Sequence, residues 1–570
     1  MSAVIEFKDF SFRYKTQQEF TLHDINLTIN SGEKVLILGP SGSGKTTLGN
    51  CINGLIPFSF NGEIKGSCKV CGLETKEASI FKISEHVGTV QQDTDAQFVG
   101  LSVGEDIAFS LENDMVPRPE MLEKVKASAK IVDMDQFLMN VPYNISGGQK
   151  QKVALAGILH NDVEILLFDE PLAALDPSMG MAAVDLIDKV HTQENKTTII
   201  IEHRLEDVLY RHIDRIILMN EGRIILDTTP NELLRSNLLK ENGIREPLYI
   251  SALKNAGVSF DNSDVLESID NLNFDKYKEK IINDFKQSKS SESSKHDEKV
   301  IEVKNVTFSY DNFIALKNVS FDIYQGEKIA VVGKNGAGKS TLAKLLCGIY
   351  RPNEGEINFY GKNYLQLSIK ELSEMVGYVM QNPNQMLVKD IIKDEIELAL
   401  KLNHYDEDLI KQRVEETLKM TGLYSMRNWP IGVLSYGQKK RVTIASILAL
   451  QPEVIILDEP TAGQDYHRYT EIMNFITELN EKHNITILFV THDMHLAIEY
   501  TDRAIVFTDG ELIGDDVVYK ILSNDDIIAR ANVKKTSLVT LAQNIGVDPE
   551  KYIHYFIQRE QEERNNDSRQ

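Results

Sequence analysis

Two glycine-rich segments of the chain end in a lysine followed by a hydroxyl residue, a pattern suited to holding phosphate groups. They read GPSGSGKT from Gly39 to Thr46 and GKNGAGKS from Gly333 to Ser340. Each follows an apolar, strand-like run and precedes a helical pattern, which is the context that a phosphate-binding loop requires. Glycines let consecutive backbone N–H groups converge on phosphate oxygens, and the helix N-terminus adds its positive dipole end. The two segments therefore predict two nucleotide sites.

The side chains of these loops predict how a nucleoside triphosphate is held. Lys45 and Lys339 are expected to reach the β- and γ-phosphates of ATP, while the hydroxyls of Thr46 and Ser340 ligate Mg²⁺. The predicted nucleotide-binding residues of the loops and helix starts are Gly39, Ser41, Gly42, Gly44, Lys45, Thr46 and Thr47, together with Gly333, Asn335, Gly336, Gly338, Lys339, Ser340 and Thr341.

Two apolar strands end in a pair of adjacent carboxylates. They are LLFDE at Leu166–Glu170 and IILDE at Ile455–Glu459. Asp169 and Asp458 are predicted to lie beside Mg²⁺ as metal ligands. Glu170 and Glu459, each followed by a proline that ends the strand, are predicted to orient and polarise an attacking water. The expected reaction is hydrolysis of ATP.

Almost every informative segment of the first half recurs in the second, so the chain is an internal repeat. Lys339 follows Lys45 by 294 residues, and Glu459 follows Glu170 by 289. We expect a first copy over 1–235, a partly disordered linker over 236–299, a second copy over 300–530 and a C-terminal extension over 531–570. The linker is expected to be irregular because its end, from Lys286 to Lys295, is polar and Ser-rich.

Composition bounds the class of protein. The 570 residues carry 62 basic and 85 acidic side chains, a formal net charge of −23. This negative charge would repel the phosphate backbone of a nucleic acid over most of the surface, so it argues against broad nucleic-acid binding. The longest apolar runs are strand-sized, and the N-terminus lacks a secretory pattern. Four cysteines are too few for a disulfide framework and suit a reducing compartment. Cys68-x-x-Cys71 could be half of a zinc site, but without a second such pair the two residues are interpreted as structural. A cytoplasmic location is expected.

The segments ISGGQ at Ile145–Gln149 and LSYGQ at Leu434–Gln438 resemble the LSGGQ signature of the ATP-binding-cassette (ABC) ATPases. The resemblance covers about Val4 to Asp227 and Ile301 to Asp516. It implies an α/β fold with two P-loop NTPase domains in tandem, each with a mixed or parallel core sheet and a helical signature subdomain.

The resemblance also implies further site residues. In the family, ATP is held between the phosphate loop of one domain and the signature of the other, which pairs Lys45 with Ser435 and Lys339 with Ser146. By resemblance, Tyr14 and Tyr310 stack on adenine, and the signature residues Ser146, Gly148, Ser435 and Gly437 contact the γ-phosphate. Gln92 and Gln381 contact the Mg²⁺ shell, and Asp176 and Asp465 couple the two sites. His203 and His492 have a switch role. A core tyrosine on a strand is the alternative interpretation of Tyr14 and Tyr310.

Two departures from the family pattern bear on activity. Tyr436 replaces the first glycine of the second signature, and Glu202-His203-Arg204 stands where the second copy has Thr491-His492-Asp493. Both glutamates and both histidines are present, so both sites are expected to be active. The Lys45 site, which combines both departures, is predicted to be the slower one.

Within the family the chain most resembles the energy-coupling-factor ATPases of vitamin and metal-ion importers. The resemblance rests on four segments, Gln92–Phe98, Gly243–Pro247, Gln381–Leu387 and Thr461–Asp465. It implies that the two ABC halves pair within one chain, on the cytoplasmic face of the membrane, with a transmembrane scaffold subunit and a substrate-binding membrane subunit as partners.

Other classes of tandem ABC ATPase are alternatives. A soluble translation factor acting on the ribosome would carry a long, charged, helical linker and basic RNA-facing surfaces. A DNA-repair or structural-maintenance ATPase would need a coiled-coil insertion. The Ser-rich linker, the acidic composition and the lack of sustained heptads favour the importer.

Overall fold

The computed structural model describes residues 2–92, 97–160, 163–173, 175–286, 298–311, 313–461 and 464–567. The chain divides into two compact units. The first comprises Met1–Tyr277 with Gly463–His467, and the second comprises Lys278–Ala462 with Arg468–Gln570. None of the helices within the described ranges is long and apolar enough to cross a membrane.

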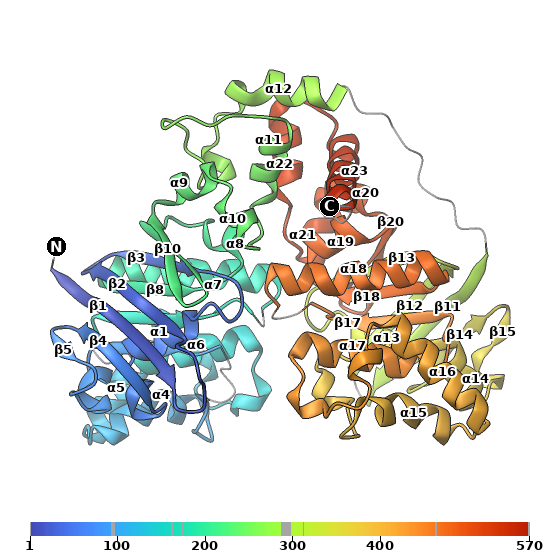
Figure 1. The fold of residues 1–570 in the computed structure, drawn as a ribbon, viewed down its shortest axis with the longest axis horizontal. Helices are drawn as coiled ribbons and strands as arrows, with labels where there is room; N and C mark the ends of the chain where they lie inside the picture. The colour runs from blue at the N-terminus through green and yellow to red at the C-terminus, as the bar shows by residue number, and fades with distance from the viewer. Residues whose placement is uncertain are drawn as a thin grey trace. The chain divides into compact units, whose positions relative to one another are not determined.

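The core of the first unit is a six-stranded sheet in the order β10-β9-β3-β8-β7-β6, of which Figure 1 labels β3, β8 and β10. All neighbours are parallel except β9 and β10, which form an antiparallel edge. The central strands β3, β7 and β8 are buried along nearly their whole length and are mostly apolar, as expected for parallel strands that are covered on both faces. The strands are β3 (Lys34–Leu38), β6 (Val87–Val90), β7 (Ile165–Asp169), β8 (Thr197–Ile201), β9 (Arg215–Asn220) and β10 (Arg223–Thr228).

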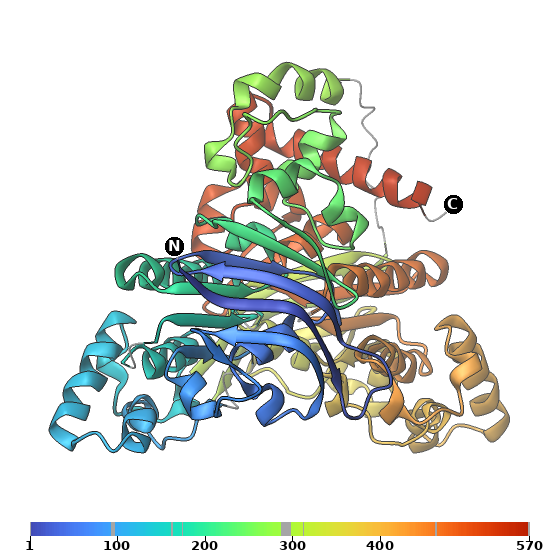
Figure 2. The same ribbon diagram turned by 60° about the vertical axis from the view of Figure 1, so that its left-hand side comes forward.

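A smaller antiparallel sheet, in the order β2-β1-β4-β5, shares the same hydrophobic core. Figure 2 shows its first two strands, in dark blue, lying side by side. Ile5 and Phe7 are buried on either side of the more exposed Glu6, as expected for a sheet with one face on the core, and after a register shift Phe10 and Phe12 continue the buried face. The strands are β1 (Ala3–Tyr14), β2 (Leu22–Asn30), β4 (Gly62–Val70) and β5 (Leu73–Glu74).

Helices of the first unit hold the phosphate loop and form the signature subdomain. Helix α1 follows β3 after the phosphate loop. Helices α4, α5 and α6 pack on one another as a separate layer with their own buried apolar residues. The helices are α1 (Lys45–Ile52), α2 (Leu55–Phe58), α3 (Ile80–Ser84), α4 (Val103–Asn113), α5 (Arg118–Ile131), η2 (Asp135–Phe137), η3 (Pro142–Asn144), α6 (Gly147–Leu159), α7 (Pro177–Glu194) and α8 (Leu205–Val208).

The segment after β10 differs from the irregular linker that the sequence suggested. Leu239, Tyr249 and Leu253 are buried, and the Tyr249 hydroxyl donates a hydrogen bond to the carbonyl of Leu266 at 2.6 Å. This apolar packing supports short helices up to Lys286, while residues 287–297, with most of the Ser-rich run, lie outside the described residues. The helices are α9 (Pro230–Arg235), α10 (Leu238–Glu241), α11 (Leu248–Asn255), η4 (Ile269–Asn271) and α12 (Phe274–Lys286).

The second unit repeats both sheets, in the orders β12-β11-β14-β15 and β16-β17-β18-β13-β19-β20. Parallel pairing again holds throughout the larger sheet except between β19 and β20. The strands are β11 (Lys299–Tyr310), β12 (Phe313–Tyr324), β13 (Lys328–Gly333), β14 (Glu354–Phe359), β15 (Lys362–Asn363), β16 (Val376–Val379), β17 (Val454–Asp458), β18 (Thr486–Thr491), β19 (Arg503–Thr508) and β20 (Glu511–Val517).

The helices of the second unit follow the same plan. Helices α15, α16 and α17 share a hydrophobic cluster of their own, which matches the α4, α5 and α6 layer of the first unit. The helices are α13 (Lys339–Leu346), η5 (Tyr364–Gln366), α14 (Ile369–Met375), η6 (Pro383–Gln385), α15 (Ile392–Leu402), α16 (Glu407–Met420), η7 (Tyr424–Met426), η8 (Ile431–Val433), α17 (Tyr436–Leu448), α18 (Tyr466–His483) and α19 (Met494–Tyr500).

The C-terminal extension is helical. The end of the second copy forms α20 (Val518–Ser523) and α21 (Asp525–Ala531), and the extension forms α22 (Ser537–Ile545) and α23 (Pro549–Asp567). The ring of Phe285, at the end of α12, packs at 5.8 Å from the ring of Tyr552 and 5.6 Å from that of Tyr555. Arg559 adds an ion pair with Asp284. Aromatic packing and one ion pair therefore attach α23 to the end of α12.

Candidate active site

The first phosphate loop joins β3 to α1 and folds around the ammonium group of Lys45. Lys45 Nζ donates hydrogen bonds to the carbonyls of Gly39 at 2.7 Å and Pro40 at 3.0 Å. Only glycine fits at Gly39, where a Cβ would lie 2.3 Å from the Met219 carbonyl oxygen. Lys45 is 6% exposed, and burial lowers its pKa against the opposing effects of nearby carboxylates, first Glu170.

The second phosphate loop, between β13 and α13, repeats this geometry. Lys339 Nζ donates to the carbonyls of Gly333 at 2.7 Å and Lys334 at 3.0 Å. A Cβ at Gly333 would lie 2.2 Å from the carbonyl oxygen of Phe507, so glycine is again required. The predicted loop residues of both copies are thus brought together around a buried lysine.

The loops suit a polyphosphate. Gly42 and Gly336 adopt left-handed φ angles of 81° and 80°, and no atom lies within 4 Å of the place where a Cβ would be. The backbone is therefore open to a ligand at the point where a side chain would block it. Together with a buried lysine and a helix N-terminus, this open backbone is the donor set that phosphate oxygens require.

Oxygen atoms suited to Mg²⁺ lie beside each loop. Thr46 Oγ1 lies 3.5 Å from Asp169 Oδ1, and the Ser340 side chain hydrogen-bonds to Asp458. Burial and the neighbouring Glu170 raise the pKa of Asp169 to about 6, and burial also raises the pKa of Asp458. A hydroxyl with a carboxylate is a pair of hard oxygen ligands, so these residues fit Mg²⁺.

Glu170 and Glu459 follow β7 and β17 in a constrained backbone conformation. Their φ angles are 49° and 42°, in the left-handed region that such residues seldom adopt. Each N–H donates at 2.8 Å to the end of the neighbouring strand, Glu170 to Ile201 and Glu459 to Val490. Strain of this kind costs on the order of 1–3 kcal/mol and is typical of functional sites.

In the second copy, Glu459 is held by the end of β18. His492 Nδ1 lies 2.7 Å from Glu459 Oε1, and the backbone N–H of His492 donates to the same oxygen at 3.2 Å. The Thr491 hydroxyl donates to Oε2 at 3.2 Å. Both carboxylate oxygens are therefore held by Thr491 and His492.

The first copy holds its glutamate differently. Gln92 Nε2 donates to Glu170 Oε2 at 2.6 Å, which joins two of the predicted site residues. His203 Nδ1, however, lies 3.3 Å from Glu202 Oε1 and 4.0 Å from Glu170 Oε1. Glu202, in the place of Thr491, thus competes with Glu170 for the histidine.

Glu202 is fully buried and forms a network of its own. Its exposed fraction is 0%, and it accepts hydrogen bonds from the backbone N–H groups of His203 at 2.8 Å and Leu172 at 3.1 Å. Burial raises the pKa of Glu170, His203 lowers it, and the charge of Glu202 raises it further. Sequence reasoning noted Glu202 as a departure but missed its influence on Glu170, the predicted catalytic carboxylate.

The predicted adenine-stacking tyrosines lie close to the phosphate loops. The Tyr14 hydroxyl is 3.1 Å from Thr47 Oγ1, and the Tyr310 hydroxyl is 3.3 Å from Thr341 Oγ1. Both rings pack edge-on against a phenylalanine two residues earlier, at 4.8 and 4.9 Å. The tyrosines are therefore positioned beside the helix that follows each loop.

The two signature serines cap helices in the same way. The backbone N–H of Ser146 donates to the Gln149 side chain at 2.9 Å, and Ser435 does the same with Gln438. The side chains of Ser146 and Ser435 each accept the reciprocal backbone bond at 3.3 Å. Gly148 and Gly437 follow in the first turn of the helix in each copy.

Tyr436 leaves this cap unchanged because its side chain extends toward Gln381. Its hydroxyl donates to the Gln381 carbonyl at 3.0 Å. Lys440 Nζ, one turn along α17, donates to the carbonyls of Met380 at 2.8 Å and Gln381 at 2.9 Å. The second signature is therefore tied to the segment around Gln381, which sequence reasoning did not foresee.

Other predicted residues have local partners. Asp176 caps α7 by accepting from the N–H of Met179 at 2.9 Å, and Asp465, which groups with the first unit, accepts from the N–H of Ser41 at 3.1 Å. Within the predicted segments Gln92–Phe98 and Thr461–Asp465, residues 93–96 and 462–463 lie outside the described residues.

Comparison with known proteins identifies the family. The model described as "ABC transporter" matches residues 22–173 and 316–462. This chain belongs to the ABC transporter ATP-binding proteins. A second model, described as "ATP-binding cassette cobalt transporter", matches residues 236–308. ABC proteins hydrolyse ATP, normally with Mg²⁺, so the chain is an ATPase, and the prediction of two ABC domains with an α/β fold is confirmed.

Similar ABC proteins match along nearly the whole chain. A protein of Clostridium perfringens named as an ABC transporter ATP-binding protein is 54% identical over 565 residues, covering 99% of each chain. Proteins with the same description from Vibrio vulnificus and Streptococcus agalactiae are each 50% identical, over 562 and 559 residues and at least 98% of each chain. A solved structure, cbiO1 from Clostridium perfringens, described as part of the ABC transporter complex cbiONQ, is 35% identical with a TM-score of 0.38, covering 41% of this chain and 95% of that one.

Proposed function

We propose that this ABC protein is the ATPase subunit of an energy-coupling-factor importer, which drives uptake of a vitamin or metal ion through separate membrane subunits. The observation that carries the proposal is the presence, in one chain, of two complete sets of a buried phosphate-loop lysine, an aspartate at the end of a buried strand and the glutamate that follows it. The cobalt-transporter model over 236–308 supports metal-ion uptake in particular.

In this proposal, one group of residues binds the phosphates of ATP and another orients the attacking water. Lys45 and Lys339, with the backbone N–H groups of their loops, hold the β- and γ-phosphates. Glu170 and Glu459 accept a hydrogen bond from the attacking water and orient it. Mg²⁺ held beside Asp169 and Asp458 neutralises charge on the phosphate oxygens.

The remaining roles in the proposal come from the family resemblance. Ser146 and Ser435 contact the γ-phosphate, each completing the site of the other copy, and Gln92 and Gln381 contact the Mg²⁺ shell. His203 and His492 contact the γ-phosphate as the switch. We propose that the protein acts at the cytoplasmic face of the membrane, bound to a transmembrane scaffold subunit that is joined by a substrate-binding membrane subunit.

Purification of the tagged chain from gently solubilised membranes tests this function. The expected result is recovery of a multi-spanning hydrophobic subunit at constant stoichiometry. In a parallel sedimentation experiment, the chain should sediment with membranes that contain this subunit but not with protein-free liposomes. Recovery of ribosomal RNA in place of a membrane protein would support the translation-factor alternative, and strong binding to bare liposomes would overturn docking through a partner.

A further inference from the structure

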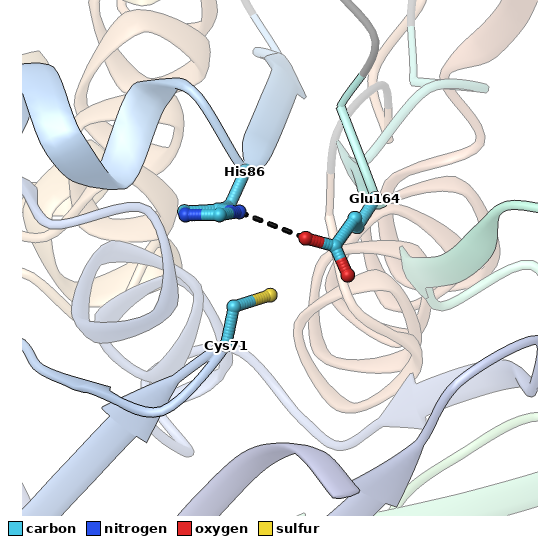
Figure 3. A group of neighbouring side chains, drawn as sticks. All are labelled: Cys71, His86 and Glu164. Carbon is cyan, nitrogen blue, oxygen red and sulfur yellow. Dashed lines mark hydrogen bonds and ion pairs between the residues drawn. The ribbon is translucent and has the colours of Figure 1, made fainter. Parts of the chain in front are cut away.

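Three side chains that suit a transition metal meet in the first unit, away from the phosphate loop. They are Cys71, in the turn between β4 and β5, His86, just before β6, and Glu164, just before β7. One ligand atom from each lies within 4.8 Å of the other two. Figure 3 shows the thiol and the imidazole directed toward the Glu164 carboxylate, and His86 Nδ1 lies 2.9 Å from Glu164 Oε1.

The fold places these residues together through paired strands. β6 and β7 are parallel, with Val87 opposite Ile165, so the residues that precede them share the amino edge of the sheet. The N–H groups of Glu164 and Ile165 donate to the His86 carbonyl at 3.0 and 2.9 Å. Gln92 and Glu170 follow the other ends of the same two strands, so this cluster is separate from the nucleotide site.

The turn that carries Cys71 is also held by backbone hydrogen bonding, like the strand ends that carry His86 and Glu164. Cys71 has a left-handed φ of 47°, and its N–H donates to the Val4 carbonyl at 2.7 Å. Its thiol is consequently held toward the other two side chains by the backbone, not by a flexible loop. A preformed arrangement of this kind lowers the entropy cost of binding an ion.

The second copy shows that the fold does not need metal ligands here. With the 289-residue offset, Tyr360, Met375 and Glu453 occupy the same three places. Tyr360 has a φ of 46°, and its N–H donates to Val300 at 3.0 Å, as in the first copy. Its hydroxyl hydrogen-bonds to Glu453, so a tyrosine, a methionine and a glutamate fill the site without a metal ligand triad. The fold of this corner therefore does not require the Cys, His and Glu of the first copy, although these three side chains also interact with one another there.

We propose that Cys71, His86 and Glu164 form a binding site for one divalent transition-metal ion, Zn²⁺ or Co²⁺. Thiolate, imidazole and carboxylate together suit these ions, whereas Mg²⁺ and Ca²⁺ prefer oxygen ligands only. The side chains of His86 and Glu164 are 29% and 53% exposed, which gives the ion a path from solvent and leaves a position for water as a fourth ligand.

Titration with Co²⁺ tests the site, because Co²⁺ reports its ligands in its spectrum. The full chain, without a polyhistidine tag, is freed of metal with a chelator and titrated in excess Mg²⁺, which occupies oxygen-only sites. We expect one Co²⁺ per chain, with a thiolate-to-cobalt charge-transfer band and the intense visible bands of a four-coordinate ion. Cys71→Ser should abolish the charge-transfer band and weaken binding roughly tenfold or more.

Matched variants separate this site from other ligands in the chain. His86→Met introduces the methionine that the second copy has at the corresponding position, Met375, so the fold accommodates this side chain. The variant should also weaken Co²⁺ binding roughly tenfold or more. Cys347→Ser removes a half-buried thiol of the second copy and should leave the spectrum unchanged. Failure to bind one Co²⁺, binding without a thiolate band, or binding that survives both Cys71→Ser and His86→Met would overturn the proposal.

Discussion

Nδ1 of His492 lies 2.7 Å from Oε1 of Glu459, whereas Nδ1 of His203 lies 4.0 Å from the matching oxygen of Glu170. The cause is the residue before each histidine. Thr491 donates its hydroxyl to Glu459, while Glu202 draws His203 toward its own carboxylate. The two copies therefore orient Glu170 and Glu459, the glutamates that we propose to be catalytic, with different partners.

We expect the two sites to hydrolyse ATP at unequal rates, with the Lys339 site the faster. Replacing Glu459 by Gln should remove much more steady-state activity than replacing Glu170 by Gln, because Glu459 has both oxygens fixed. Loss of one fixed contact to the reacting groups corresponds to roughly tenfold in rate. Phosphate release by the two single variants, with the double variant as the blank, is the measurement. Equal residual rates would contradict the asymmetry.

The charge of Glu202 should set the pH dependence of the first site. In the Glu459→Gln background, Glu202→Gln keeps the side-chain shape but removes the negative charge that raises the pKa of Glu170. Glu170 would then stay ionised to lower pH, so the acid limb of the rate profile should move to lower pH. Glu112→Gln neutralises an exposed carboxylate on α4 and serves as the control. An acid limb that stays in place would show that Glu202 does not act on Glu170.

Removal of both loop lysines should abolish nucleotide binding. In the double variant Lys45→Ala and Lys339→Ala, the cations that face the phosphates are gone, and hydrogen bonds to charged groups are worth about 1.5–3 kcal/mol each. Binding of a fluorescent ATP analogue measures the effect, with the exposed Lys82→Ala as the control. Unchanged affinity in the double variant would contradict the site assignment.

The helical layer of the first unit should weaken in acid. His160 Nε2, at the end of α6, lies 2.6 Å from Ser110 Oγ, and burial lowers the pKa of His160, with Lys124 lowering and Asp114 raising it. The unfolded chain then binds the proton more readily, so this residue stabilises the fold above about pH 6.5 and the contribution is lost as the pH falls.

The corresponding residue of the second copy supplies the variant. His160→Ala introduces the residue found at Ala449, and it should reduce the loss of thermal stability between about pH 7.5 and 5.5. Thermal unfolding followed by circular dichroism at the two pH values measures the change. An identical pH-induced shift in the variant and the wild type would show that His160 is not the group responsible.

Local pattern predicted much of the catalytic core. The strand, glycine-rich loop and helix around Lys45 depend on near neighbours in the sequence, and each loop forms as expected. Such features were predictable because each motif carries its own backbone geometry.

Features that depend on distant segments were not predictable. The expectation of irregular structure for 236–299 was wrong over much of the range, because buried Leu239 and Tyr249 pack short helices there. The expectation rested on the composition of the polar run near Lys289, at the end of the segment. The cluster of Cys71, His86 and Glu164 joins three segments with no motif spacing, so only the strand pairing of β6 with β7 reveals it. The boundaries of the four predicted domains stay predictions.

Side-chain hydrogen bonds join α17 to the segment around Gln381 in the second copy. The side chains of Tyr436 and Lys440 donate hydrogen bonds to backbone carbonyls of this segment, and Lys439 Nζ donates to Asn384 Oδ1 at 3.0 Å. We therefore expect a displacement of Gln381 to move the first two turns of α17 with it, through the side chains of Tyr436, Lys439 and Lys440, while the Ser435 cap stays intact.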